Sequence, residues 1–235
     1  MGSSRLPGKV LADIGGHAAL DLMIQRIRLS DQIDDIVVAT STAPQDDAIA
    51  AWARDAGVHV HRGSEDDVLQ RVSDAHAAMR SDVIVELTGD CPLIDPGIID
   101  LAVETFLANR CDVVSSAHSG TYPSGTDVQV FRASDLAEIA ATVTDPAVRE
   151  HVSLHFYESP ERYAVIYLVA PRGSRMPGTR LDLDYPEDLV FIRAILAELE
   201  PRFGLDFGTA DIAELLVREP RLAEINAHCV NKAAR

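Results

Sequence analysis

The chain has 235 residues, of which 47% are apolar, and its formal net charge is −16 at pH 7. This size and apolar content exclude a disordered protein, and the acidic excess argues against nucleic acid as a partner, because phosphate contacts need a basic face. The three cysteines form no Cys-x-x-Cys pair and no apolar run reaches the ~20 residues that span a bilayer, so we expect a reduced, cytoplasmic protein that contacts no membrane.

The first two thirds of the chain alternate between short apolar runs and longer amphipathic segments. Strands are predicted at 34–41, 58–63, 82–90 and 112–117, and helices at 18–29, 45–57, 64–80 and 97–109. Gly57 is expected to end the second helix and Ser64 to cap the third. Such alternation predicts an α/β fold, with a mostly parallel sheet between two layers of helices.

The pattern becomes less regular after about residue 119. Turn residues near Pro123 and Gly125 precede a predicted strand, 148–159 is predicted to be helical, and 163–170 is predicted to be a strand. The segment 179–184 is predicted to be a strand that leads into a long helix starting at Pro186. Because no Pro- or Ser-rich linker divides the chain, we expect one domain over residues 1–235.

The opening segment "MGSSRLPGK" has the residue types of an anion-binding loop. Glycines let backbone amides approach an anion, while Arg5 and Lys9 supply full positive charges. The segment matches neither the P-loop nor the dinucleotide fingerprint. A basic N-terminus without a special role is therefore the alternative.

Two aspartates follow predicted strands. Asp90 ends the strand in "LTGDCP", and Asp184 stands in "LDLDYPEDL" just before a helix. At one edge of a sheet, two carboxylates could hold a Mg²⁺ ion that bridges phosphate oxygens during phosphoryl or nucleotidyl transfer. The alternatives are a turn-forming role for Asp90 and a helix cap for Asp184.

Several motifs together resemble the cytidylyltransferases of the spore-coat-polysaccharide (SpsF-like) type, which are related to the acylneuraminate and 3-deoxy-manno-octulosonate cytidylyltransferases. The motifs are "MGSSRLPGKVL", "VHRGSEDDVLQR", "LTGDCPLIDP", "YPSGTDVQVF", "REHV" and "LDYPEDL". The resemblance extends to about residue 200. It implies a Rossmann-like nucleotidyltransferase fold and an enzyme that transfers CMP from CTP to a sugar, such as a nonulosonate-like sugar acid, for surface polysaccharide synthesis.

The resemblance also implies roles for individual residues. Arg5 and Lys9 would be catalytic and would grip the triphosphate, and Asp90 and Asp184 would bind Mg²⁺. Contacts to the nucleotide would come from Gly2, Ser3, Ser4, Arg62, Thr88 and Gly89. The segment 119–155 would face the sugar or the second subunit of a homodimer, with Tyr122, Asp127, Arg149 and His151 as the substrate residues.

The sequence departs from the family pattern at three places. Relatives carry a strand directly before the "MGSSRLPGK" motif, so we expect such a strand to precede Met1 in the natural protein. Glu86 stands where relatives often carry Arg, so either a charge near the site is reversed or the Glu86 side chain points elsewhere. Asp182 replaces a more usual Thr and creates an Asp-x-Asp pattern with Asp184.

Two alternatives to the cytidylyltransferase reading stay open. Glycosyltransferases use an Asp-x-Asp pattern to hold a metal and a nucleotide sugar, so a glycosyltransferase is one of them. A truncated, inactive homologue with a structural or regulatory role is the other. Release of pyrophosphate from CTP separates the first two activities, and nucleotide binding without turnover would indicate the inactive homologue.

Overall fold

A computed structural model describes residues 1–3 and 5–230. Its strands are β1 (Asp13–Ile14), β2 (His17–Ala18), β3 (Val37–Ser41), β4 (His59–Gly63), β5 (Val83–Glu86), β6 (Val113–Ser115), β7 (Gln129–Arg132) and β8 (Val165–Tyr167). Its α-helices are α1 (Ala19–Ile27), α2 (Asp47–Asp55), α3 (Val68–Met79), α4 (Pro96–Ala108), α5 (Ala133–Thr142), α6 (Pro146–Glu150), α7 (Leu154–Glu158), α8 (Pro186–Phe203), α9 (Thr209–Arg218) and α10 (Arg221–Glu224).

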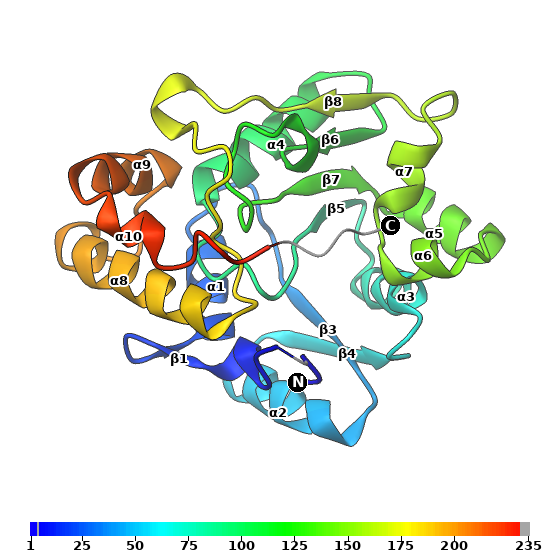
Figure 1. Ribbon diagram of the computed structural model, residues 1–235. Coiled ribbons are helices and arrows are strands. Elements are labelled where there is room, and N and C mark those ends of the chain that lie inside the picture. Colours follow the sequence, from blue (N-terminus) through cyan, green and yellow to red (C-terminus); the bar gives the residue numbers. More distant parts are fainter. Residues whose placement is uncertain (4, 231–235) are drawn as a thin grey trace.

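The main sheet has the strand order β5-β7-β6-β8 (Figure 1). β7 is antiparallel to both of its neighbours and β8 is parallel to β6, so β5, β6 and β8 run in one direction and β7 in the other. Within the described residues β3 and β4 form a separate parallel pair, and β1 and β2 form a short hairpin. The strand expected before Met1 lies outside the sequence and stays a prediction.

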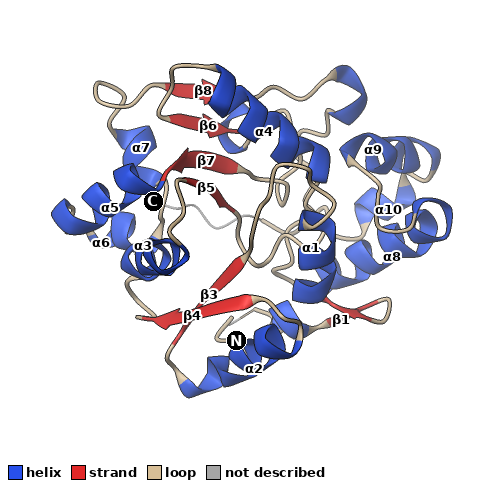
Figure 2. Cartoon of the chain, turned by 180° about the vertical axis from the view of Figure 1, so that it is seen from behind, coloured by secondary structure: helices blue, strands red, loops and turns tan. Residues whose placement is uncertain are grey.

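Helices cover both faces of the main sheet. Alternate residues of a strand point to opposite faces, and the chain uses this in β6, where Val113 packs with α5–α7 while Val114 packs with α1 and α4. In β7, Phe131 likewise packs with α5–α7, and Val130 packs with α1 and α4. Figure 2 shows α3 and α5–α7 on one side of these strands and α1 and α4 on the other. The predicted α/β/α layering is therefore confirmed.

The C-terminal helices form a third cluster beside the sheet. Phe191, Ile195 and Leu199 of α8 are fully buried or nearly so, and they pack with Ile14 of the β1–β2 hairpin and with Leu183. The same cluster includes buried residues of α9. It fixes the segment before α8, which carries Asp184, against the rest of the fold.

Most of the predicted elements are present, with differences at their ends. Gly57 follows α2 with a φ of 65°, as expected for a residue that ends a helix. Ser64 does not cap α3; Asp67 does, by accepting a hydrogen bond from the amide of Gln70. The helix predicted over 148–159 is divided into α6 and α7, and the strand predicted over 179–184 amounts to a single bridge between Arg180 and Ser124.

No helix in the described ranges 1–3 and 5–230 is long and apolar enough to cross a membrane.

Arg26 of α1 is a buried cation that connects distant parts of the chain. Its side chain is fully buried and donates to the carbonyl oxygens of Ile94, Leu205 and Phe207 at 2.8, 2.6 and 2.7 Å. The guanidinium also lies 4.1 Å from the centre of the Phe207 ring. One side chain thus joins the loop before α4 to the connection between α8 and α9.

We expect Arg26→Ala to lower the free energy of unfolding by about 3–5 kcal/mol, because three carbonyl groups, two of them in buried hydrogen bonds, lose their donor. Arg28→Ala is the matched control, since Arg28 is exposed and makes one 3.5 Å contact to the Ala56 carbonyl. Its expected effect is about 0.5 kcal/mol or less. Urea unfolding of both variants measures the difference, and equal losses would contradict a structural role for Arg26.

Candidate active site

The opening loop turns sharply before it presents Lys9. Gly8 has a φ of 73°, a left-handed conformation that favours glycine, and the 3₁₀ turn Lys9–Leu11 begins directly after it. The Gly8 amide donates to the carbonyl of Met1 at 3.2 Å. This geometry directs the side chain of Lys9 toward the end of β5.

The ammonium group of Lys9 lies between two carboxylates. Its Nζ is 2.7 Å from Oδ2 of Asp90 and 2.8 Å from Oδ1 of Asp184. Arg5 binds the other oxygen of Asp184 at 2.7 Å, and its guanidinium lies 4.8 Å from the centre of the Tyr185 ring. The structure therefore brings Arg5, Lys9, Asp90 and Asp184 into one cluster.

Backbone contacts hold the two aspartates together. The amide of Leu183 donates to the carbonyl of Asp90 at 2.8 Å, so the segment before α8 lies against the loop after β5. The buried carboxylate of Asp188 accepts from the amides of Asp184 and Tyr185 at 3.0 and 2.9 Å. Tyr185, not Asp184, is the cap residue of α8, so the side chain of Asp184 is free to contact cations.

The charges of this cluster shift each other's pKa values. Burial alone would lower the pKa of Lys9, but the attraction of Asp90 and Asp184 outweighs it and the pKa lies above its ordinary value. Burial would raise the pKa of Asp90, but the charge and hydrogen bonds of Lys9 hold it below the usual range. Both groups are therefore charged at neutral pH.

Two further aspartates lie beside the cluster. Burial, and then the negative charges of Asp182 and Asp90, raise the pKa of Asp127 to about 6. Burial likewise raises the pKa of Asp182, whose carboxylate accepts from the Ser124 hydroxyl at 2.5 Å. These acids give the site more negative charge than its cations balance.

Gly125 allows the segments that carry these two acids to meet. It has a φ of 86°, and a Cβ at this position would lie 2.4 Å from the backbone of Leu181 and Asp182. Directly before it, the amide of Ser124 donates to the carbonyl of Thr179, and the carbonyl of Ser124 accepts from the amide of Leu181. A side chain at position 125 would separate Asp127 from Asp182.

The residues expected to bind nucleotide lie around the same region. Thr88 and Gly89 are exposed directly after β5, whereas Arg62 at the end of β4 binds the carbonyls of Ser41 and Ala43 and the carboxylate of Asp47. The remaining three are in the opening segment: Gly2 packs against Gln45, the Ser3 hydroxyl accepts from the Leu6 amide at 3.3 Å, and Ser4 lies outside the described residues.

The residues expected to face the sugar do not form one group with Asp127. Tyr122 is 8% exposed and belongs to the core on the α1–α4 side. Arg149 of α6 is bound to Asp67 and to the carbonyls of Ala140 and Val143, which connects α6 to α3 and α5. His151 is half-buried and follows the end of α6. Their role toward substrate stays a prediction.

Sequence reasoning did not identify Arg180, Tyr185 and Asp188 as parts of the site. Arg180 is 7% exposed and lies 3.2 Å from Asp188, 3.6 Å from Asp182 and 3.7 Å from Asp184. A signal was present, because an acidic residue three positions after the start of a helix commonly accepts from the backbone amides ahead of it. "DYPEDL" has this spacing.

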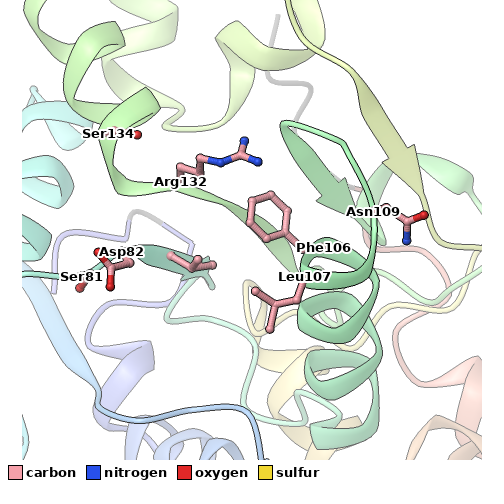
Figure 3. Close-up of a pocket in the computed structure, with 8 residues that line it drawn as sticks. Ser81, Asp82, Phe106, Leu107, Asn109, Arg132 and Ser134 are labelled. Carbon is pink, nitrogen blue, oxygen red and sulfur yellow. The ribbon is translucent and has the colours of Figure 1, made fainter.

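A cavity of about 480 Å³ lies at the other end of β5 (Figure 3). It is lined by Ser81, Asp82, Val83, Phe106, Leu107, Asn109, Arg132 and Ser134. Its cation, Arg132, lies over the Phe106 ring, and Nη1 of Arg132 already donates to the carbonyl of Cys111. We assign no function to this cavity.

A charged cluster at the carboxyl end of β5 in a layered α/β sheet is the arrangement of nucleotide-binding α/β enzymes. Comparison with known proteins specifies the class. The cytidylyltransferase family model matches residues 1–210. The spore coat polysaccharide biosynthesis protein SpsF of Bacillus subtilis is 34% identical over 228 residues, which are 95% of this chain and 93% of SpsF.

Solved structures agree with this result. A cytidylyltransferase from Leptospira borgpetersenii is 32% identical and superposes with a TM-score of 0.88 over 95% of this chain and 92% of that chain. CMP:2-keto-3-deoxy-manno-octonic acid synthetase complexed with CTP, 18% identical, shares the fold with a TM-score of 0.60 over 84% of this chain and 95% of that chain. The chain belongs to the cytidylyltransferase family, whose members are CTP-dependent nucleotidyltransferases, and the resemblance seen in its motifs is confirmed.

Glu86, at the end of β5, is a carboxyl group in an unfavourable environment. Its Oε2 atom is buried and has no hydrogen-bond partner in the described part of the chain. Burial raises the pKa of Glu86 to about 7, against a hydrogen bond from Ser153 that acts in the opposite direction. Ionised Glu86 therefore destabilises the folded state.

We expect Glu86→Gln to stabilise the protein at alkaline pH. The pKa of Glu86 is about 7 in the folded state and 4.5 for the free side chain. The folded state therefore loses its full share of stability to Glu86 ionisation above pH 7, and this loss disappears as the pH falls toward 4.5. The gain in the free energy of unfolding should approach roughly 3 kcal/mol above pH 8, at ~1.4 kcal/mol per pKa unit. Urea unfolding across this pH range tests it, with the exposed Glu161→Gln as control. A gain that does not change with pH would contradict the argument.

Proposed function

We propose that this chain catalyses transfer of CMP from CTP to an oxygen of a sugar, with release of pyrophosphate, and that the sugar is a nonulosonate-like acid destined for a surface polysaccharide. The observation that carries the proposal is the cluster of Arg5, Lys9, Asp90 and Asp184 at the carboxyl end of β5. Membership of the cytidylyltransferase family supports CTP as the donor.

The donor set of the cluster fits a hard divalent cation. Asp90 and Asp184 each place an oxygen within 2.8 Å of the same positive group, so their carboxylates already converge on a cation position. Carboxylate oxygens are the ligands that Mg²⁺ prefers. When bound there by Asp90 and Asp184, Mg²⁺ would neutralise charge on the phosphates of the nucleotide.

The cations of the chain act on the triphosphate. Lys9 and Arg5 exchange their carboxylate partners for phosphate oxygens, Lys9 as a mobile charge and Arg5 as a planar fork. The sugar oxygen attacks the α-phosphorus in line and pyrophosphate leaves, so the protein contributes alignment and charge stabilisation. Asp127, with a pKa of about 6, is our candidate acceptor for the proton of the sugar hydroxyl.

In this proposal Asp127 and Asp182, the two acids beside the cluster, lie where the sugar binds. Asp127 and Asp182 both lie near Asp90. Asp127 belongs to the 122–127 turn, and the same turn contacts Asp182 through the Ser124 hydroxyl and the backbone at Gly125. We propose that residues 119–155, including Tyr122, Arg149 and His151, contribute to substrate binding or to a homodimer interface. Size measurement in solution tests the dimer.

The Asp-x-Asp pattern of Asp182 and Asp184 keeps a glycosyltransferase as the second candidate. Both carboxylates lie within 3.7 Å of the Arg180 guanidinium, so they share one neighbourhood. A glycosyltransferase would release a nucleoside diphosphate or monophosphate from a nucleotide sugar, whereas the proposed reaction releases pyrophosphate from CTP. An inactive homologue would bind nucleotide without either product.

The first test is a thermal-shift panel of CTP, UTP, GTP and ATP with Mg²⁺. A ligand at a hundred times its dissociation constant stabilises the folded state by about 2.7 kcal/mol, which raises the melting temperature by a few degrees. We expect the rise with CTP alone and its loss with chelator. No rise with any nucleotide would contradict the proposal.

We expect Lys9→Met and Asp90→Asn to lower kcat/KM for pyrophosphate release from CTP and a sugar acid by at least about 100-fold, because each removes charge that stabilises the transition state. Asp31→Asn, at an exposed position outside the cluster, is the control and should retain full activity. A melting temperature close to that of the parent shows that each variant is folded. Full activity of folded Lys9→Met would overturn the assignment of Lys9.

A further inference from the structure

Three potential metal ligands of different chemistry meet at the start of α8. They are the carboxylate of Glu187, the imidazole of His228 and the thiol of Cys229, and their ligand atoms all lie within 4.8 Å of one another. Nε2 of His228 is 3.7 Å from Oε1 of Glu187. Glu187 is in the first turn of α8, whereas the other two follow α10.

The backbone that carries His228 and Cys229 is already held against α8. The buried side chain of Asn226 donates to the carbonyl of Arg180 at 3.1 Å and to the carboxylate of Asp188 at 2.8 Å. The amide of Cys229 donates to the carbonyl of Asn226 at 2.9 Å. A metal ion would therefore find its ligands close together and would not have to order this segment.

We propose that Glu187, His228 and Cys229 bind one zinc ion. A donor set of one nitrogen, one sulfur and one oxygen is typical of zinc and differs from the oxygen-only set of Asp90 and Asp184, which suits magnesium. Zinc bonds of about 2.0–2.3 Å require the three ligand atoms to approach one another by roughly 1 Å. The exposed His228 and the half-exposed Glu187 side chains can make this movement.

The surrounding charge favours a cation. The Cys229 thiol lies beside the carboxylate of Glu187 and interacts electrostatically with that of Asp188. These carboxylates attract a divalent ion. Zinc binds cysteine as the thiolate, so its binding releases the thiol proton.

The proposed site adjoins the catalytic cluster through one side chain. The Tyr185 hydroxyl donates to the carbonyl of Val230 at 3.3 Å and accepts from the guanidinium of Arg5 at 3.3 Å. Zinc at residues 187, 228 and 229 would fix residues 226–230 over Tyr185. The metal would then hold the partner of Arg5 in place without contacting the nucleotide.

Titration of the full chain with Co²⁺, a spectroscopic substitute for zinc, tests the proposal directly. We expect one equivalent of Co²⁺ to give a near-ultraviolet thiolate charge-transfer band that zinc abolishes by displacement. Cys229→Ser should remove the band, and Glu187→Gln and His228→Asn should each weaken Co²⁺ binding at least about tenfold, since one of three ligands is lost. Cys111→Ser is the matched control, because Cys111 is a free cysteine buried in the core.

Two results would overturn the site. One is the absence of a thiolate band at one equivalent of Co²⁺ in the parent chain, and the other is a band that persists in Cys229→Ser. Asp90→Asn should keep the band unchanged, which separates this site from the magnesium site. All of the altered ligands lie at the surface or are half-buried, and circular dichroism shows whether each variant is folded.

Discussion

The ion pairs of Lys9 with Asp90 and Asp184 are the contacts on which the rest of the site depends. They join the opening loop, the end of β5 and the segment before α8, which are far apart in the sequence. Taking three charged groups out of water is costly unless each is paired, and here each is. The pairs hold the carboxylates around a cation position before any ligand arrives, which is the preorganisation that charge-stabilised catalysis needs.

The sequence was informative where chemistry depends on residue type at the end of a strand. Arg5, Lys9, Asp90 and Asp184 were all singled out from composition, strand ends and family resemblance, and the fold brings them together. Which of two neighbouring polar residues caps a helix was harder to predict. Ser64 and Asp67 could both cap α3, and Asp67 does so while it also binds Arg149, a partner 82 positions away.

Other features depend on long-range packing, so the sequence could indicate a turn or a helix but not what it contacts. β7 is antiparallel to both of its neighbours in the sheet. The turn before it lies against Leu181 and Asp182, where Gly125 permits close approach. Arg26 belongs to a helix with charged residues on its surface, yet its own side chain is buried and binds three carbonyl groups. The proposed zinc ligands could not be predicted from the sequence either. Glu187 is some 40 positions from His228 and Cys229, and the chain has no Cys-x-x-Cys pair that would indicate a zinc site.

The balance of charge in the site explains why a divalent ion belongs to the proposed reaction. Asp90, Asp127, Asp182 and Asp184 contribute carboxyl groups, against the cations Arg5, Lys9 and Arg180. If Lys9 and Arg5 bind a triphosphate, Asp90 and Asp184 lose their positive partners. Their carboxylates would then be unpaired next to the negative charge of the phosphates. Mg²⁺ at Asp90 and Asp184 would restore the balance at the atoms that lost their partners. Burial and, after it, the negative charges of Asp182 and Asp90 raise the pKa of Asp127 in the free chain, and binding a cation nearby should lower that pKa.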